Sequence, residues 1–176
     1  MQVSLLGSRQ FDGARGALIE LLLDSVSHGA SIGFLDDLTQ AEAAAYWDGV
    51  TASVMRGERI LWSAEHQGQL VGTVQLELCR RKNGVNRAEI QKLLVHSGAR
   101  RLGIASALMQ EVEQHARSLQ RGLLYLDTEA GSPAEALYQA LGYTTIGGLP
   151  DYACSPDGTW TANAIYYKTL FLRSTQ

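Results

Sequence analysis

The sequence predicts a mixed α/β fold, in which helices flank a mostly antiparallel sheet that contains one parallel strand pair. Three observations support this prediction. Two helical segments precede the main run of strands, tight-turn signals then join three successive strands, and a strand–helix–strand order follows. The last order implies a parallel pair, because a crossover helix returns the chain to the same end of the sheet. With 176 residues, 45% of them hydrophobic, the chain suits one domain covering residues 1–176.

Periodicity and turn residues predict the elements of the first half. Apolar residues at 3–6 indicate a short strand, and apolar residues at helical spacing predict a helix over about 12–27. Thr39 and Glu42 have the spacing of a capping box, so a second helix begins there and extends to about Arg56. The strands that follow are predicted at 59–66, 70–79 and 88–95, separated by glycine-containing turns.

The second half alternates between helices and strands. A long helix is predicted over about 102–120, with Ile104, Leu108, Val112 and Ala116 on one face. Ser132, followed by a proline and by Glu135 three residues on, predicts a second capping box and a short helix that stops at Gly142. The remaining strands are predicted at 123–127, 144–147 and 164–171.

Composition excludes several classes of protein. A net charge of −3, with one short basic cluster at 80–82, argues against a nucleic-acid partner. Neither a signal peptide nor an apolar run of membrane-spanning length is present, which predicts a cytoplasmic protein without a membrane partner. Two cysteines, Cys79 and Cys154, do not make a disulfide framework. The histidines lack metal-ligand spacing, so no metal is expected; they are His28, His66, His96 and His115.

A candidate phosphate-binding segment lies at 95–106, where a strand ends and a helix begins. Free N–H groups and the helix dipole at such a start attract anions. Gly103 has no Cβ to hold a phosphate away from the backbone, and Arg100 and Arg101 add positive charge. An ordinary strand-to-helix turn is the alternative interpretation. The patterns G-K-[ST] and G-x-G-x-x-G are absent, which argues against a P-loop and a dinucleotide fold.

Two motifs carry a resemblance to a known superfamily. Arg100-x-x-Gly103-x-Ala105 resembles motif A of the GNAT acetyltransferases, and Ala134-x-x-x-Tyr138-x-x-x-Gly142-Tyr143 resembles their second signature. The element order also matches, so the resemblance covers nearly the whole chain. Several segments are moreover similar to the tabtoxin-resistance acetyltransferases, which act on an amino-acid-like toxin; these segments are 29–31, 86–89, 126–132 and 155–158.

The resemblance implies acetyl-CoA as co-substrate, held where the parallel strands splay apart. Its pantetheine amides would pair with the backbone of Leu93 and Val95, and its pyrophosphate would rest on the N–H groups of 102–106. The implied cofactor-binding residues are Leu93, Leu94, Val95, Arg100, Arg101, Leu102, Gly103, Ile104, Ala105, Ser106, Thr128, Ala134 and Tyr138.

Tyr138, Glu89 and Asp127 are the candidate catalytic residues. The motif match implies that the Tyr138 hydroxyl protonates the departing thiolate; the alternative is a core tyrosine. Glu89 and Asp127 are candidate bases that remove a proton from the amine, or anchors for its ammonium group. Alternatively, Glu89 pairs with Arg87, and Asp127 holds the turn at 129–132. A side-chain period of two places Glu89 on one face with Gln91, Leu93 and Val95.

The expected activity is acetyl transfer to the primary amine of a small molecule, such as an amino-acid-like toxin or antibiotic. Without G-x-S-x-G, direct attack in a ternary complex is favoured over a serine acyl-enzyme. The alternatives are a protein or peptide N-acetyltransferase and a non-catalytic acyl-CoA-binding module. Candidate substrate-binding residues are Ser31, Phe34, Glu89, Asp127, Tyr152 and Tyr166. A homodimer that pairs through the late strands, around 160–171, is a further expectation.

Overall fold

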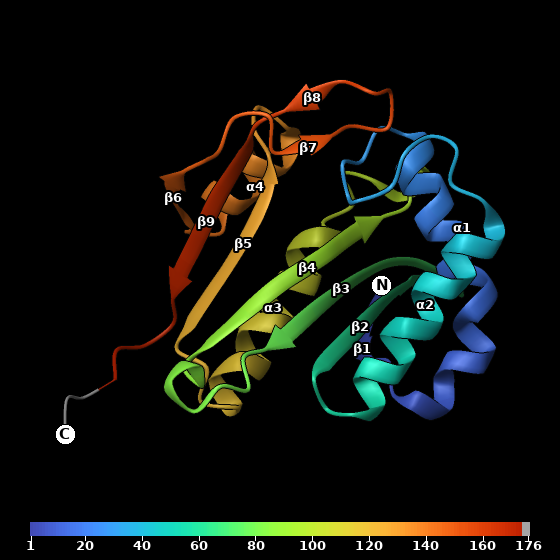
Figure 1. Cartoon of the computed structure of the whole chain (residues 1–176). Coiled ribbons are helices and arrows are strands. Elements are labelled where there is room, and N and C mark those ends of the chain that lie inside the picture. Colours follow the sequence, from blue (N-terminus) through green and yellow to red (C-terminus); the bar gives the residue numbers. More distant parts are fainter. Residues whose placement is uncertain (174–176) are drawn as a thin grey trace.

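A computed structural model describes residues 1–173 of the chain. In this part of the chain, seven strands form one twisted sheet in the order β1-β2-β3-β4-β5-β9-β6, and only β4 and β5 run parallel. Helices α1 and α2 cover one face of the sheet, and α3 and α4 lie against the other (Figure 1). The predicted fold class is therefore confirmed.

The elements lie close to their predicted ranges. The helices are α1 (Phe11–Ser27), α2 (Gln40–Met55), α3 (Ile104–Ser118) and α4 (Pro133–Ala140). The strands of the main sheet are β1 (Gln2–Leu5), β2 (Arg59–His66), β3 (Gln69–Leu78), β4 (Arg87–Val95), β5 (Leu123–Glu129), β6 (Thr144–Gly147) and β9 (Asn163–Thr169). Two further short strands, β7 (Ala153–Cys154) and β8 (Trp160–Thr161), form a separate ribbon that the sequence did not predict.

Side-chain contacts explain where the helices begin and which faces they bury. The Thr39 capping box of α2 is confirmed: the Glu42 N–H donates to the Thr39 hydroxyl at 3.2 Å, and the Thr39 N–H donates to the Glu42 carboxylate at 2.9 Å. Each bond satisfies a backbone donor that the helix leaves free. The predicted apolar face of α3 is also confirmed, because all four of its residues are buried; these are Ile104, Leu108, Val112 and Ala116.

The second capping box is wrong. Ser132 is the N-cap of α4, but its side chain makes no capping hydrogen bond. Glu135 instead accepts from the Gly131 N–H at 2.6 Å and from the Tyr166 hydroxyl of β9. A partner from a distant strand therefore outweighs the local capping pattern.

A β-bulge interrupts β4 in its middle. Opposite β3, Thr73 pairs with Leu94 but Gln75 pairs with Gln91, so β4 contains one extra residue. Lys92 lies at this point with φ 49°, a left-handed conformation that is uncommon for a residue other than glycine.

The bulge reverses the order in which β4 side chains alternate. Leu94 packs with the core beneath α1 and α2, whereas Leu93 and Val95 pack against the core on the α3 side. The prediction that Glu89 shares a face with Leu93 and Val95 is therefore wrong, because a strict period of two holds only in an unbroken strand.

The pairing of β9 bears on the predicted homodimer. β9 pairs with β5 on one side and with β6 on the other, so it has no free edge to pair across subunits. The prediction of dimer pairing is wrong for this strand.

The β7–β8 ribbon reaches across to the loop after α1, where the Asp36 N–H donates to the Pro156 carbonyl at 3.2 Å. Among the described helices, none is long and apolar enough to cross a membrane.

Candidate active site

The two parallel strands separate part of the way along their length. Their ladder joins residues 87–89 of β4 to 123–125 of β5 and ends at the pair Glu89–Tyr125. Beyond that pair the strands diverge, as Figure 1 shows, and the β5-facing edge of 90–95 has no strand partner. Because exposed strand edges accept extended chains, this gap can bind a ligand that carries amide groups.

Unpaired backbone donors lie at the start of α3, just beyond the end of β4. In the described chain, the N–H groups of 101–106 donate to no protein group, and the first helical bond runs from Ala107 to Gly103. Gly103 has φ 78°, and a Cβ built on it would meet nothing within 4 Å. Arg100 and Arg101 are both exposed beside this open space. The arrangement suits a phosphate or pyrophosphate. We call residues 101–106 the cradle.

Tyr138 comes from α4 and is 6% exposed. Its ring lies 5.9 Å from the Tyr143 ring and 6.0 Å from the Tyr166 ring. Burial raises the pKa of the Tyr138 hydroxyl, and the nearby Asp127 carboxylate raises it further. The phenol therefore keeps its proton at neutral pH and can act as a donor.

Thr128 and Ala134, the other residues that the resemblance implies near the cofactor, lie at the junction of β5 and α4. The Thr128 hydroxyl is 3.4 Å from that of Ser132. Ala134 is partly buried against the core on the α3 side. Both therefore lie within a few residues of Asp127 or Tyr138 in the chain.

Glu89 lies at the point where the strands begin to separate, and a tyrosine binds it. The Tyr125 hydroxyl donates to the Glu89 carboxylate at 3.1 Å. No ion pair joins Glu89 to Arg87 within residues 1–173, so the alternative interpretation of this glutamate is wrong. Burial and the Glu89 charge raise the pKa of Tyr125 to about 12, so this phenol also remains a donor. Sequence analysis missed Tyr125, although the two-residue spacing from Asp127 places both on one face of β5.

Asp127 presents an exposed carboxylate two residues beyond the last ladder pair. The side-chain amide of Asn163 donates to it at 3.5 Å, at the limit of a hydrogen bond. The alternative role for Asp127, holding the turn at 129–132, is wrong because Glu135 accepts the Gly131 N–H. Asp127 is thus free to meet a cationic or proton-donating ligand.

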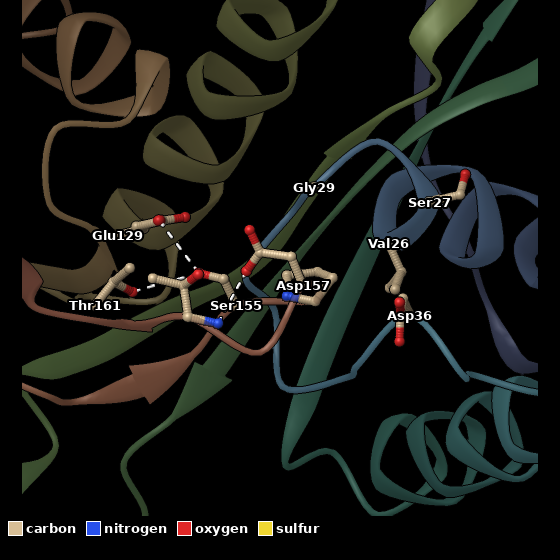
Figure 2. Close-up of a pocket in the computed structure, with 10 residues that line it drawn as sticks. Val26, Ser27, Gly29, Asp36, Glu129, Ser155, Asp157 and Thr161 are labelled. Atoms are coloured by element: carbon tan, nitrogen blue, oxygen red, sulfur yellow. Dashed lines mark hydrogen bonds between the residues drawn. The ribbon is translucent and has the colours of Figure 1, made fainter.

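A pocket of about 360 Å³ lies between the loop after α1, the end of β5 and the β7–β8 ribbon (Figure 2). Its carboxylates are those of Asp36, Glu129 and Asp157, and no described residue that lines it is basic. The Ser155 hydroxyl donates to Glu129 at 3.3 Å and so fixes one wall. A pocket of this charge favours a ligand that carries an amine.

The predicted substrate-binding residues of the loops lie near the segments that line this pocket but do not line it themselves. Phe34 packs edge-on against Tyr46, with ring centroids 5.4 Å apart, and Ser31 is partly buried in the same loop. Tyr152 is exposed at the base of the ribbon. Tyr166 is fully buried, and its hydroxyl donates to Glu135 on the α4 face of the sheet. The geometry therefore gives Tyr166 a packing position beside Tyr138.

The comparisons with known proteins agree with this geometry. The model of the acetyltransferase (GNAT) family matches residues 20–143, which is more than half of the chain. The match covers both the gap between β4 and β5 and the start of α3, so the fold is that of an acetyltransferase. The chain belongs to the GNAT acetyltransferase family.

Solved structures extend the likeness over the whole chain. A ribosomal-protein-alanine N-acetyltransferase from Brucella melitensis superposes with a TM-score of 0.78 at 22% identity, covering 96% of this chain and 99% of that one. The Salmonella typhimurium protein yncA, solved with acetyl-CoA, gives 0.80 at 17% identity, covering 100% and 97%. An aminoglycoside 6'-acetyltransferase type Ii gives 0.72 at 24% identity, covering 99% and 100%. At these identities the likeness shows a shared fold.

Proposed function

We propose that the protein is an N-acetyltransferase that transfers the acetyl group of acetyl-CoA directly to the primary amine of a small molecule. The observation that carries this proposal is the opening between β4 and β5. The cradle, at the start of α3, lies at one side of this opening, and the acidic pocket beside α1 lies at the other. A thioester held in the opening would be accessible to an amine from the pocket.

The chain's own residues fit the two ends of the cofactor. The N–H groups of the cradle, with Arg100 and Arg101, would hold the pyrophosphate. The unpaired edge at 93–95 would hold the pantetheine amides. When bound, acetyl-CoA supplies an activated acyl group as a thioester.

Three side chains would accept or donate the protons of the reaction. An alkylammonium cannot attack until it loses a proton, and Glu89 and Asp127, carboxylates on the two strands that border the opening, would accept it. Tyr138, which keeps its proton, would donate it to the departing sulfur. No covalent enzyme intermediate is required.

The shape of the pocket favours a small acceptor. A peptide acceptor usually needs a long open groove, whereas here the Asp36–Pro156 hydrogen bond joins the two walls. The similarity of segments such as 126–132 to the tabtoxin-resistance acetyltransferases supports an amino-acid-like toxin or antibiotic as acceptor. The proposal includes a cytoplasmic location, as the sequence predicts.

Thiol release from acetyl-CoA, measured with a panel of amino acids, polyamines and aminoglycosides, tests the proposal. We expect amine-dependent release with the wild type, and loss of acetylated product in Glu89→Gln, Asp127→Asn or both. A base contributes roughly 10²–10⁴-fold to kcat, and its removal abolishes the acidic limb of the pH–rate profile. An anchor instead raises KM and leaves kcat largely unchanged.

Tight binding of CoA without turnover of any amine would overturn the proposal and favour the non-catalytic module. Turnover of a peptide amine alone would favour the protein acetyltransferase.

A further inference from the structure

Lys92 is a cation that the proposed reaction has not used. Its side chain is partly buried, and it lies in the bulge of β4, within the part of that strand that has separated from β5. The left-handed φ of 49° is a strained conformation for lysine. Such strain is concentrated at functional sites, because the surrounding structure must hold it in place.

The ammonium of Lys92 points toward the acceptor side of the sheet. A Cβ built on Gly33 would lie 3.9 Å from the Lys92 Nζ, so the loop after α1 lies over this group. That loop also contains Asp36, which lines the acidic pocket. The cofactor cradle is on the opposite face with α3.

Charges of both signs surround Lys92, yet within residues 1–173 its Nζ has neither an ion-pair nor a hydrogen-bond partner. Arg59 is near and is already engaged with Glu77 at 2.5 Å and with Gln75 at 2.8 Å. Burial lowers the pKa of Lys92, and Arg59 lowers it further, whereas Asp127 and Glu89 act in the opposite direction. A partly buried cation beside a second cation is costly unless an anion compensates it.

The positions of these charges describe a complementary ligand. Glu89 and Asp127 attract the amine of the acceptor, and Lys92 offers a positive charge in the same part of the site. A ligand with an amine alone would leave the Lys92 ammonium without a direct hydrogen-bond or ion-pair partner. A zwitterion, with an acidic group a few bonds from its amine, satisfies both signs.

We propose that Lys92 is a specificity-determining residue that binds the carboxylate of the acceptor. This inference rests on the proposed acetyl transfer and adds to it a requirement for an acidic group. Charge-assisted hydrogen bonds to a carboxylate are strong and short, and the flexible lysine stem allows the ammonium to reach one.

The test compares amino acids with their primary carboxamides, which have nearly the same size but no negative charge. For each pair, kcat/KM is measured with the wild type, Lys92→Met, Lys92→Arg and the control Lys82→Met. Lys82 is an exposed lysine at the turn before β4, so its variant changes net charge equally without touching the site.

We expect the wild type to prefer the acid over the amide. Lys92→Met should lower kcat/KM for the acid by about 10- to 100-fold, mainly through KM, and leave the amide nearly unaffected. Lys92→Arg should restore part of the preference, and Lys82→Met should behave as the wild type. Equal losses for acid and amide, or an unchanged ratio in Lys92→Met, would overturn the proposal.

Failure of the proposed function gives a different result. If no amine is acetylated, the same acids and amides are titrated by calorimetry into CoA-saturated wild type and Lys92→Met. Binding of the acid that disappears in Lys92→Met supports the lysine site without transfer. Absence of any such difference overturns it.

Discussion

At Tyr138 the ring and the hydroxyl have separate roles, and a single substitution distinguishes them. The ring fills space between Tyr143 and Tyr166, so Tyr138→Phe should fold normally. The hydroxyl is the proposed proton donor, and its loss should lower kcat by about 100-fold or more while acetyl-CoA affinity stays unchanged. Steady-state kinetics and CoA titration measure the two quantities.

Tyr143→Phe provides the matched control for Tyr138. Its ring contacts that of Tyr138 and its side chain is equally buried, so removing its hydroxyl perturbs the same cluster without removing the proposed donor. Turnover of Tyr143→Phe should remain near that of the wild type. Unchanged turnover in Tyr138→Phe would remove that residue from the mechanism.

Single residues of the site differed in how far the sequence could predict them. Tyr138 and Gly103 belong to motifs of fixed spacing, so a match to the motif identifies these residues directly. Lys92 carried no local signal, because its position depends on a bulge opposite β3. The spacing from Asp127 gave only the strand face of Tyr125, and its contact with Glu89 depends on the register between β4 and β5. Such pairings join segments that are distant in sequence.

The turn that begins α3 allows a prediction at the level of one element. Gly103 and Gly68 have nearly the same left-handed φ, 78° and 77°, and a Cβ on either would meet nothing within 4 Å. Alanine at either site should therefore lower the free energy of unfolding by about 1–2 kcal/mol, because the left-handed region disfavours a Cβ. Only at Gly103 would the new methyl group occupy the cradle.

CoA binding should therefore separate the two alanine variants. A ligand that binds only the folded state adds about 2.7 kcal/mol to the free energy of unfolding at a concentration of 100 Kd, and this raises the melting temperature. Gly68→Ala should keep this shift, and Gly103→Ala should lose most of it. Equal shifts in both variants, measured by differential scanning fluorimetry, would place the diphosphate elsewhere.

The elements that were predicted well have signals within their own segments. The α2 capping box, the apolar face of α3 and the 59–79 hairpin are all read from neighbouring residues. The sequence did not predict the bulge or the β7–β8 ribbon, for two different reasons. A bulge is a mismatch between two strands, and strands of two residues are too short for any periodic pattern.

Across the whole molecule, one carboxylate joins the α1 layer to the segment that leads into the cradle. Asp24 near the end of α1 accepts the N–H and the hydroxyl of Ser97, each at 2.7 Å, in the turn between β4 and α3. His28 and His96 lie 3.3 and 3.6 Å from the same carboxylate. Burial would raise the pKa of Asp24, but the Ser97 bonds and the two histidines outweigh it and lower the pKa below its usual 3.8.

Replacing Asp24 should destabilise the whole fold in a pH-dependent way. Asp24→Asn presents an amide donor toward the Ser97 donors and should lower the free energy of unfolding by about 2 kcal/mol at pH 7. Because the folded pKa of Asp24 lies below the unfolded one, its contribution is complete above about pH 4–5. This contribution is lost as the pH falls from the unfolded pKa through the folded pKa. The difference in free energy of unfolding between wild type and variant should therefore narrow toward pH 3.

Urea unfolding at pH 7, 5 and 3 measures this difference, with Asp48→Asn as the control. Asp48 pairs with Arg15 on the surface, its side chain is 60% exposed, and its loss should change stability little at any of the three values. A constant gap down to pH 3 would show that Asp24 acts through packing and not through its charge. The opposite result, a gap that closes with acid, would show that an ionised Asp24 holds the α1 layer against the turn from which α3 and its free N–H groups begin.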